Sequence, residues 1–151
     1  MYIFDTCSFI TLEYNYPHYN FPTLWDQFEK IITAGKILSS EVILKEILNG
    51  KDIIKSWAKS HSDIFIPVTK ELQDQTRVIV NQYPSILNYR KVKSGADPFI
   101  IAMAINYNGT LVTEETPSGS QIPKKIPDIC SILGVKCHNV LNFIKKEKIQ
   151  V

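Results

Sequence analysis

Short apolar segments alternate along this chain with longer segments of helical periodicity, and this alternation limits the fold more than any other feature. The apolar segments lie at 1–4, 36–39, 63–66, 110–113 and 135–137. Apolar spacing and end signals predict helices over 7–14, 23–34, 41–48, 52–59, 70–82, 99–107, 128–133 and 139–146. Strands that alternate with helices are typical of an α/β fold with a mainly parallel sheet.

The length of 151 residues fits one domain over 1–151. Hydrophobic residues make up 44% and charged residues 21%, which argues against disorder and against a coiled coil. No apolar stretch approaches the ~20 residues that a membrane span needs, and the N-terminus has no basic signal region. Three cysteines, an odd number, are expected to be reduced thiols. We therefore expect a cytoplasmic protein with no membrane segment.

Several acidic residues occur where a solvated carboxylate is not expected. Asp5 ends the first apolar segment, and Glu114 and Glu115 follow the segment 110–113. Asp97 stands at the start of a helix of almost unbroken hydrophobicity. Sites in parallel sheets gather outside the carboxyl ends of the strands, where loops meet helix starts. These acids are therefore expected to share one location.

A helical wheel adds Glu46 to this group. At about 100° per residue, Glu46 lies about 40° from Val42, between Val42 and Ile43 on the apolar face. Glu41 lies on the polar side of the same helix and is expected to be solvated. Glu46 is therefore expected to point inward or along the edge of the core.

Each of these acids also has an ordinary structural explanation. Asp5 and Asp97 could cap the helices that follow them. Glu46 could reach water from the edge of the core, and Glu114 and Glu115 could be solvated in a loop. The common location of the acids, rather than any single position, favours a functional site.

Four carboxylates in one pocket repel each other unless a cation neutralises them. Hard oxygen ligands without His or Cys suit Mg²⁺ or Mn²⁺. Such an ion lowers the pKa of a bound water, holds phosphate oxygens and stabilises the charge of an in-line displacement. The chemistry that this pattern predicts is hydrolysis of a phosphodiester.

Taken in order, the motifs resemble those of a PIN domain. They are the strand that ends in Asp5-Thr6, VILKEIL at 42–48, ADPFIIA at 96–102 and LVTEE at 111–115. With KIPDIC at 125–130 and LGV at 133–135, the whole chain is similar to the small bacterial and archaeal PIN-like proteins of the DUF4411 family. The resemblance implies a three-layer α/β/α fold, dependence on Mg²⁺ or Mn²⁺, and RNA hydrolysis that leaves a 5′-phosphate and a 3′-hydroxyl.

The resemblance implies catalytic and metal-binding roles for four acids, which are Asp5, Glu46, Asp97 and Glu115. Glu115 is selected because the fourth acid of PIN domains usually lies two residues after the threonine that Thr113 matches, and Glu114 is the alternative. Thr6 and Thr113 are expected to orient the carboxylates. Asp128 is an accessory candidate, for which capping of a short helix is the structural alternative.

The remaining expectations concern partners. Basic residues near the proposed site are candidates for contacts with RNA phosphates, or ordinary solvated loops; they are Arg90, Lys91, Lys93, Lys124 and Lys125. The aromatic loop 14–21 could stack on bases or pack over the core or a dimer partner. The resemblance further implies a homodimeric toxin that a small protein antitoxin silences. The alternative is a PIN-like module that binds RNA or a protein without cleaving.

Overall fold

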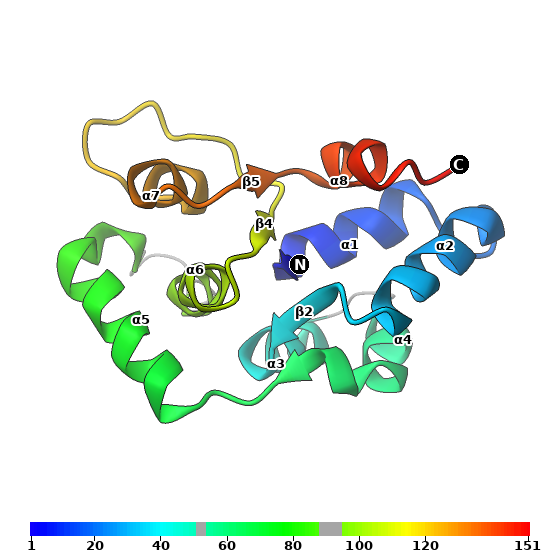
Figure 1. Cartoon of the computed structure of the whole chain (residues 1–151), viewed down its shortest axis with the longest axis horizontal. Helices are drawn as coiled ribbons and strands as arrows, with labels where there is room; N and C mark the ends of the chain where they lie inside the picture. The colour runs from blue at the N-terminus through cyan, green and yellow to red at the C-terminus, as the bar shows by residue number, and fades with distance from the viewer. Residues whose placement is uncertain (51–53, 88–94) are drawn as a thin grey trace.

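The computed structural model of the chain describes residues 1–50, 54–87 and 95–151. In these ranges five strands form one parallel sheet in the order β3-β2-β1-β4-β5. The strands are β1 (Tyr2–Phe4), β2 (Ile37–Ser40), β3 (Phe65–Ile66), β4 (Thr110–Val112) and β5 (Cys137–His138). The sheet is flanked by helices (Figure 1), so the predicted α/β fold is confirmed.

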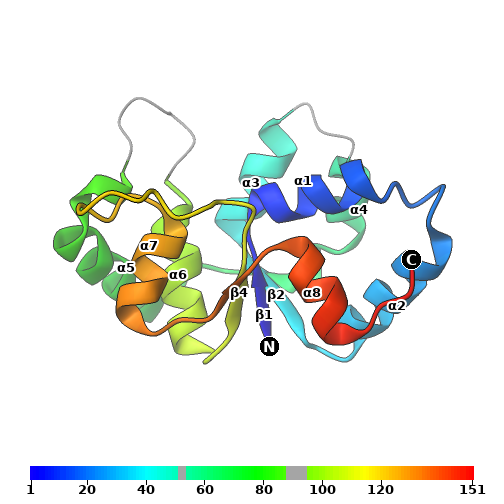
Figure 2. The ribbon, with the colours of Figure 1, turned by 90° about the horizontal axis from the view of Figure 1, so that it is seen from above.

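Helices cover both faces of this sheet. They are α1 (Thr6–Asn15), α2 (Pro22–Thr33), α3 (Glu41–Asn49), α4 (Lys55–Ser60), α5 (Lys70–Gln82), α6 (Asp97–Asn106), α7 (Ile126–Leu133) and α8 (Val140–Glu147). Figure 2 shows α5, α6 and α7 on one side, and α1, α2 and α8 on the other. The strand order accounts for this division for the helices between strands, because the chain steps from β1 to β2 in one direction and from β4 to β5 in the other, and crossovers of the usual right hand then lie on opposite faces.

The predicted elements differ from the observed ones mainly at their ends. The segment 63–66 is a 3₁₀ turn, Ser62–Ile64, followed by the two-residue strand β3. The last strand is Cys137–His138 rather than 135–137, because Gly134 and Val135 form the turn that closes α7. The helix expected over 52–59 corresponds to α4, which is Lys55–Ser60. Residues 52 and 53 of the expected helix lie outside the described ranges.

Phe4 is the centre of the core on the α1 side of the sheet. Its fully buried ring lies 5.1 Å from the ring of Phe9 in α1, 5.8 Å from Phe28 in α2 and 5.1 Å from Phe143 in α8, measured between centroids. Aromatic pairs at such distances stabilise a core beyond the burial of their area. The packing fixes the turn from β1 into α1, and therefore the position of Asp5.

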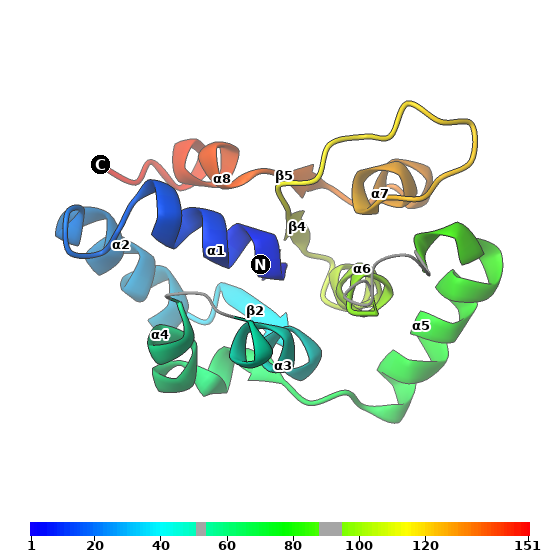
Figure 3. The same ribbon diagram turned by 180° about the vertical axis from the view of Figure 1, so that it is seen from behind.

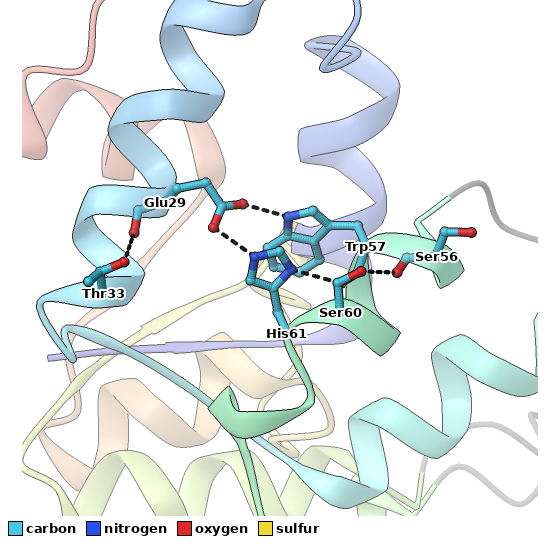
Figure 4. Close-up of polar contacts among 6 residues, drawn as sticks. All are labelled: Glu29, Thr33, Ser56, Trp57, Ser60 and His61. Carbon is cyan, nitrogen blue, oxygen red and sulfur yellow. Dashed lines mark hydrogen bonds and ion pairs between the residues drawn. The ribbon is translucent and has the colours of Figure 1, made fainter.

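A polar cluster fastens α4 to α2 on the same side (Figure 4). The Glu29 carboxylate accepts a hydrogen bond from Trp57 Nε1 at 2.9 Å and lies 2.7 Å from His61 Nε2. The His61 ring stacks on Trp57, with centroids 4.5 Å apart. Trp57 can therefore pack against the core while its polar edge remains hydrogen-bonded.

The C-terminus lies beside α2 (Figure 3), where Gln27 and Gln150 exchange two hydrogen bonds of 3.2 Å. Of the helices in the described ranges, none has the length and apolar character to cross a membrane.

Candidate functional site

The carboxyl ends of β1 and β4 lie next to each other in the middle of the sheet. Phe4 pairs with Val112, and the Asp5 N–H donates to the Val112 carbonyl over 3.1 Å. The strand order reverses between β1 and β4, which is where ligands bind in open α/β sheets. The structure therefore brings Asp5 to the same edge as Glu114 and Glu115, as the sequence predicted.

Asp5 combines a structural role with an unfavourable position for a charge. Its Oδ1 accepts from the Ser8 N–H over 2.6 Å, so Asp5 caps α1, and Ser8 Oγ donates to the Val112 carbonyl over 2.8 Å. The side chain is only 4% exposed. Burial raises the pKa of Asp5 to about 6, although hydrogen bonds with Thr113 and Ser8 act in the opposite direction. The charge of Glu115 raises this pKa further.

Glu46 lies half-buried on α3 and is fixed from α1. Thr6 Oγ1 donates to Glu46 Oε2 over 2.6 Å. The wheel correctly placed Glu46 beside apolar side chains, since Ile43 and Ile47 of the same helix are buried. Glu41 was expected to be solvated, but its Oε1 accepts from the Val68 N–H over 2.9 Å, and this bond lowers the pKa of Glu41.

Asp97 is the first residue of α6, and Ala96 occupies the position that precedes the helix. Asp97 therefore lies in the first turn of α6, one residue inside the N-cap position. Asp97 is half-buried, and Pro98 follows it as a residue whose fixed backbone suits the first turn of a helix.

Glu114 and Glu115 each bind the start of a different helix. Glu114 Oε1 accepts from the Val140 N–H of α8 over 2.7 Å. Glu115 Oε2 accepts from the Ile126 N–H of α7 over 3.0 Å, and the Glu115 N–H donates to Thr113 Oγ1 over 3.1 Å. These are favourable positions for carboxylates, because helix N-termini carry partial positive charge. The alternative, in which both acids are simply solvated in a loop, does not hold, because each is half-buried and accepts a backbone hydrogen bond.

All four predicted acids affect the pKa of one residue, Cys7. Although Cys7 has exposed surface, its thiol is partly buried, and this burial together with four carboxylate charges raises the pKa of Cys7 to about 12. In decreasing order they belong to Asp5, Glu115, Asp97 and Glu46. All four acids are therefore close enough for their charges to act on one thiol in the first turn of α1. Cys7 stands two residues after Asp5 in the sequence, and it was not expected to be a nucleophile, because no histidine was suggested as its base.

The donor chemistry of this group fits a hard divalent cation. The four side chains offer carboxylate oxygens, and the charge of Glu115 disfavours the ionised form of Asp5. Among the residues that the structure describes, no three His, Cys, Asp or Glu side chains form a ready-made metal site. The charge effects among these acids and the lack of a compact group of metal ligands are compatible, because charges act over longer distances than a coordination bond spans.

Asp128 organises the loop before α7. Its carboxylate accepts from the N–H groups of Ser118 at 2.8 Å, Lys124 at 3.2 Å and Lys125 at 3.1 Å. Burial alone would raise the pKa of Asp128, but these bonds outweigh it and lower the pKa. Lys125 occupies the N-cap position of α7, and Asp128 is the third helical residue, whose carboxylate accepts from the Lys125 N–H as in a capping box. The structural alternative, capping of this short helix, is therefore confirmed, although Asp128 acts from inside the helix and not as the N-cap residue.

The basic candidates divide into two groups. Lys124 is exposed and Lys125 is half-buried, both at the end of the loop that follows Glu115. The candidates of the other group lie outside the described residues, and they are Arg90, Lys91 and Lys93.

The described architecture is similar to a solved structure, the "Crystal structure of VapBC2 from Rickettsia felis bound to a DNA fragment from their promoter". The TM-score is 0.56, and the match covers 91% of this chain and 97% of that chain at 18% sequence identity. The protein therefore has a PIN-like α/β fold. The sequence model described as "Domain of unknown function (DUF4411)" matches residues 2–151, and the chain belongs to this family. No curated protein has a significant match to the sequence.

Proposed function

We propose that the protein is a metal-dependent endoribonuclease that hydrolyses RNA phosphodiesters with Mg²⁺ or Mn²⁺. The observation that supports this most is that Asp5 and Glu115 follow neighbouring strands at the sheet edge where ligands bind in such folds, with Glu46 bonded to Thr6 beside Asp5. The charges of these three acids and of Asp97 all act on Cys7. The acids are Asp5, Glu46, Asp97 and Glu115. A buried Asp5 with a raised pKa also favours an external positive charge in this site.

The four acids would hold the cation, and the surrounding residues keep them in position. Ser8 holds Asp5 through its backbone N–H, Thr6 holds Glu46, and the start of α7 holds Glu115. When bound, a divalent cation would neutralise charge on the phosphodiester and activate water for attack. Lys124 and Lys125 follow Glu115 along the chain and would contact the RNA backbone. Arg90, Lys91 and Lys93 remain candidates from the sequence.

The deciding experiment is cleavage of single-stranded RNA by the purified protein with Mg²⁺, Mn²⁺ or EDTA. We expect cleavage with either cation and none with EDTA. Asp5→Asn and Asp97→Asn should each abolish cleavage. Asp74→Asn is the matched control, because Asp74 lies exposed on α5 and forms a surface ion pair of 3.2 Å with Arg77 of the same helix.

Two outcomes would contradict the proposed mechanism. Cleavage that persists in EDTA would exclude an essential divalent cation, and cleavage that survives both substitutions would exclude the acids as the site. A protein that binds Mg²⁺ or Mn²⁺ but cleaves no RNA would favour the alternative, a PIN-like module that binds RNA or a protein.

We further propose that the protein is a cytoplasmic toxin, that it forms a homodimer, and that a small antitoxin silences it. The support is the family resemblance and the fold shared with VapBC2, which is described on promoter DNA. Induced expression of the chain should arrest growth, and Asp97→Asn should relieve the arrest. Co-expression of a small protein from the neighbouring gene should do the same. Light scattering tests the dimer, since one chain has a mass of 17.3 kDa.

A further inference from the structure

Both tryptophans of the chain line one pocket on the α1 side of the sheet. Trp25 belongs to α2 and Trp57 to α4, and Glu13 of α1 lines the same pocket. The pocket has a volume of about 420 Å³, which is within the range of pockets that bind small organic molecules. The proposed ribonuclease activity gives it no role.

The apolar walls of the pocket are held in place by hydrogen bonds. Pro22 and the two indoles form these walls, and the indole centroids lie 5.7 Å apart with their planes at 67°. Trp25 Nε1 donates to the Tyr16 carbonyl over 2.6 Å, and Trp57 Nε1 donates to Glu29 over 2.9 Å (Figure 4). Because both indole N–H groups already have acceptors, the indoles offer a ligand apolar ring surface rather than a hydrogen bond.

The polar part of the lining is acidic. It holds the carboxylates of Glu13, Asp26 and Glu29, and among the lining residues that the structure describes none is a lysine or an arginine. Glu13 is only 4% exposed, and its two oxygens lie 2.9 and 3.0 Å from one nitrogen, Nδ1 of His18. One N–H cannot use all the lone pairs of a carboxylate, so Glu13 can accept further hydrogen bonds. A buried carboxylate with spare acceptor capacity favours a positively charged ligand.

We propose that this pocket binds a small organic cation with a guanidinium head group. A guanidinium is planar and weakly hydrated, and its N–H donors form a fork that pairs with carboxylates. Its edge would bond to the carboxylates of the lining, and its flat face would lie on the apolar walls, where an indole attracts a cation. A metal ion would leave the apolar walls without a contact, and an anion would meet three like charges.

The pocket and the proposed catalytic acids lie at opposite ends of α1. Asp5 precedes the first turn of this helix, whereas Glu13 stands in its last turn. At 1.5 Å per residue, these two positions lie roughly 12 Å apart along the helix axis. The two groups of acids can therefore be replaced separately, and the inference does not rest on RNA cleavage.

The test follows the tryptophan fluorescence of the full chain during titration with butylguanidinium. Because both tryptophans line the pocket, binding should change the emission in a saturable way. Two matched probes separate charge from shape. Butylurea has the same shape without the charge and should cause no saturable change. Butylammonium has the charge without the planar fork and should bind more weakly.

Replacement of the lining acids tests the site itself. Glu13→Gln and Asp26→Asn keep the shape of the side chain, and each should weaken the binding of butylguanidinium on the order of tenfold. Asp26 is exposed, so its replacement tests the pocket even if Glu13→Gln does not fold. Asp74→Asn on α5 is the control and should bind like the wild type.

A wild-type protein whose fluorescence shows no saturable change would overturn the proposal, as would unchanged affinity in both Glu13→Gln and Asp26→Asn. Equal binding of butylurea would show that the charge is not recognised, and equal binding of butylammonium would overturn the assignment of a guanidinium. Asp97→Asn should bind butylguanidinium like the wild type, and weaker binding would place the cation at the proposed catalytic acids instead. Because the same variant is expected to abolish cleavage, failure of this proposal is distinguishable from failure of the proposed ribonuclease activity.

Discussion

Thr6 donates a hydrogen bond of 2.6 Å to Glu46, which joins the first turn of α1 to α3. A second threonine acts similarly across the site, since Thr113 hydrogen-bonds to Asp5 and accepts from the Glu115 N–H. Thr6 follows Asp5 in the sequence and is bonded to Glu46, whereas Thr113 lies between Asp5 and Glu115 and is bonded to both. Hydroxyl groups thus hold carboxylates whose charges repel each other.

Replacement of Thr6 should impair activity through Glu46. Thr6→Val keeps the shape of the side chain but removes the donor, and we expect RNA cleavage to fall on the order of tenfold. Thr6→Ser keeps the hydroxyl and should restore most of the rate, which a purely steric role would not predict. The measurement is the initial cleavage rate at saturating Mg²⁺, with circular dichroism as the control for folding. Equal rates for the Val and Ser variants would contradict the role.

Asp5 should make the metal-free protein less stable as the pH rises. The pKa of Asp5 is raised from 3.8 to about 6 in the folded protein, mainly by burial. Between these values the folded state holds a proton that the unfolded state has lost, so the free energy of unfolding falls as the pH rises from 4 to 6. Above about pH 6 the full penalty is present, and it amounts to roughly 3 kcal/mol.

Asp5→Asn removes this penalty while retaining a residue that caps helices well. In EDTA we expect the variant to be more stable than the wild type at pH 7.5, by up to about 3 kcal/mol. The difference should shrink as the pH falls towards 4 and disappear near pH 3, where the wild-type carboxyl is protonated in both states. Urea unfolding at the two pH values measures it. If Asp5→Asn is destabilised relative to the wild type by the same amount at both pH values, the pKa of Asp5 is not raised in the folded protein.

Most helices and strands could be predicted from the sequence, because the spacing of apolar residues and the signals at helix ends depend only on neighbouring residues. Ser40 and Thr69, for example, stand at the ends that helix signals predict for α3 and α5, and their hydroxyl oxygens accept from backbone N–H groups in the first turns. The site was harder to predict, because its details depend on contacts between distant segments. Nothing in the local sequence shows that Glu114 meets Val140 or that Glu115 meets Ile126.

Because of these two contacts, we expect opposite effects on cleavage when Glu114 and Glu115 are replaced. The charge of Glu115 acts on Asp5 and Cys7, whereas Glu114 holds the start of α8. Glu115→Gln can still accept from the Ile126 N–H, so it should fold normally and lose cleavage on the order of 100-fold. Glu114→Gln is the matched variant and should retain cleavage.

Replacement of Glu114 should lower the stability of the fold rather than the rate of cleavage. Glu114→Ala removes the acceptor for the Val140 N–H and should cost about 1 kcal/mol, or about 2–4 °C in melting temperature. Cleavage at a temperature below this transition should remain near that of the wild type. If Glu114→Gln abolishes cleavage and Glu115→Gln does not, the fourth acid is Glu114.

The reactivity of Cys7 gives a direct measure of how closely the acids surround it. Alkylation proceeds through the thiolate, and the pKa of Cys7 near 12 predicts very slow reaction with iodoacetamide at pH 8. Glu46→Gln and Asp97→Asn each remove a charge that raises this pKa, so both should speed alkylation of the Cys7 peptide, as measured by mass spectrometry. Glu71→Gln is the control, because Glu71 is exposed on α5. Rates that are the same in all four proteins would show that these carboxylates do not act on Cys7, and the proposed metal site would lose that support.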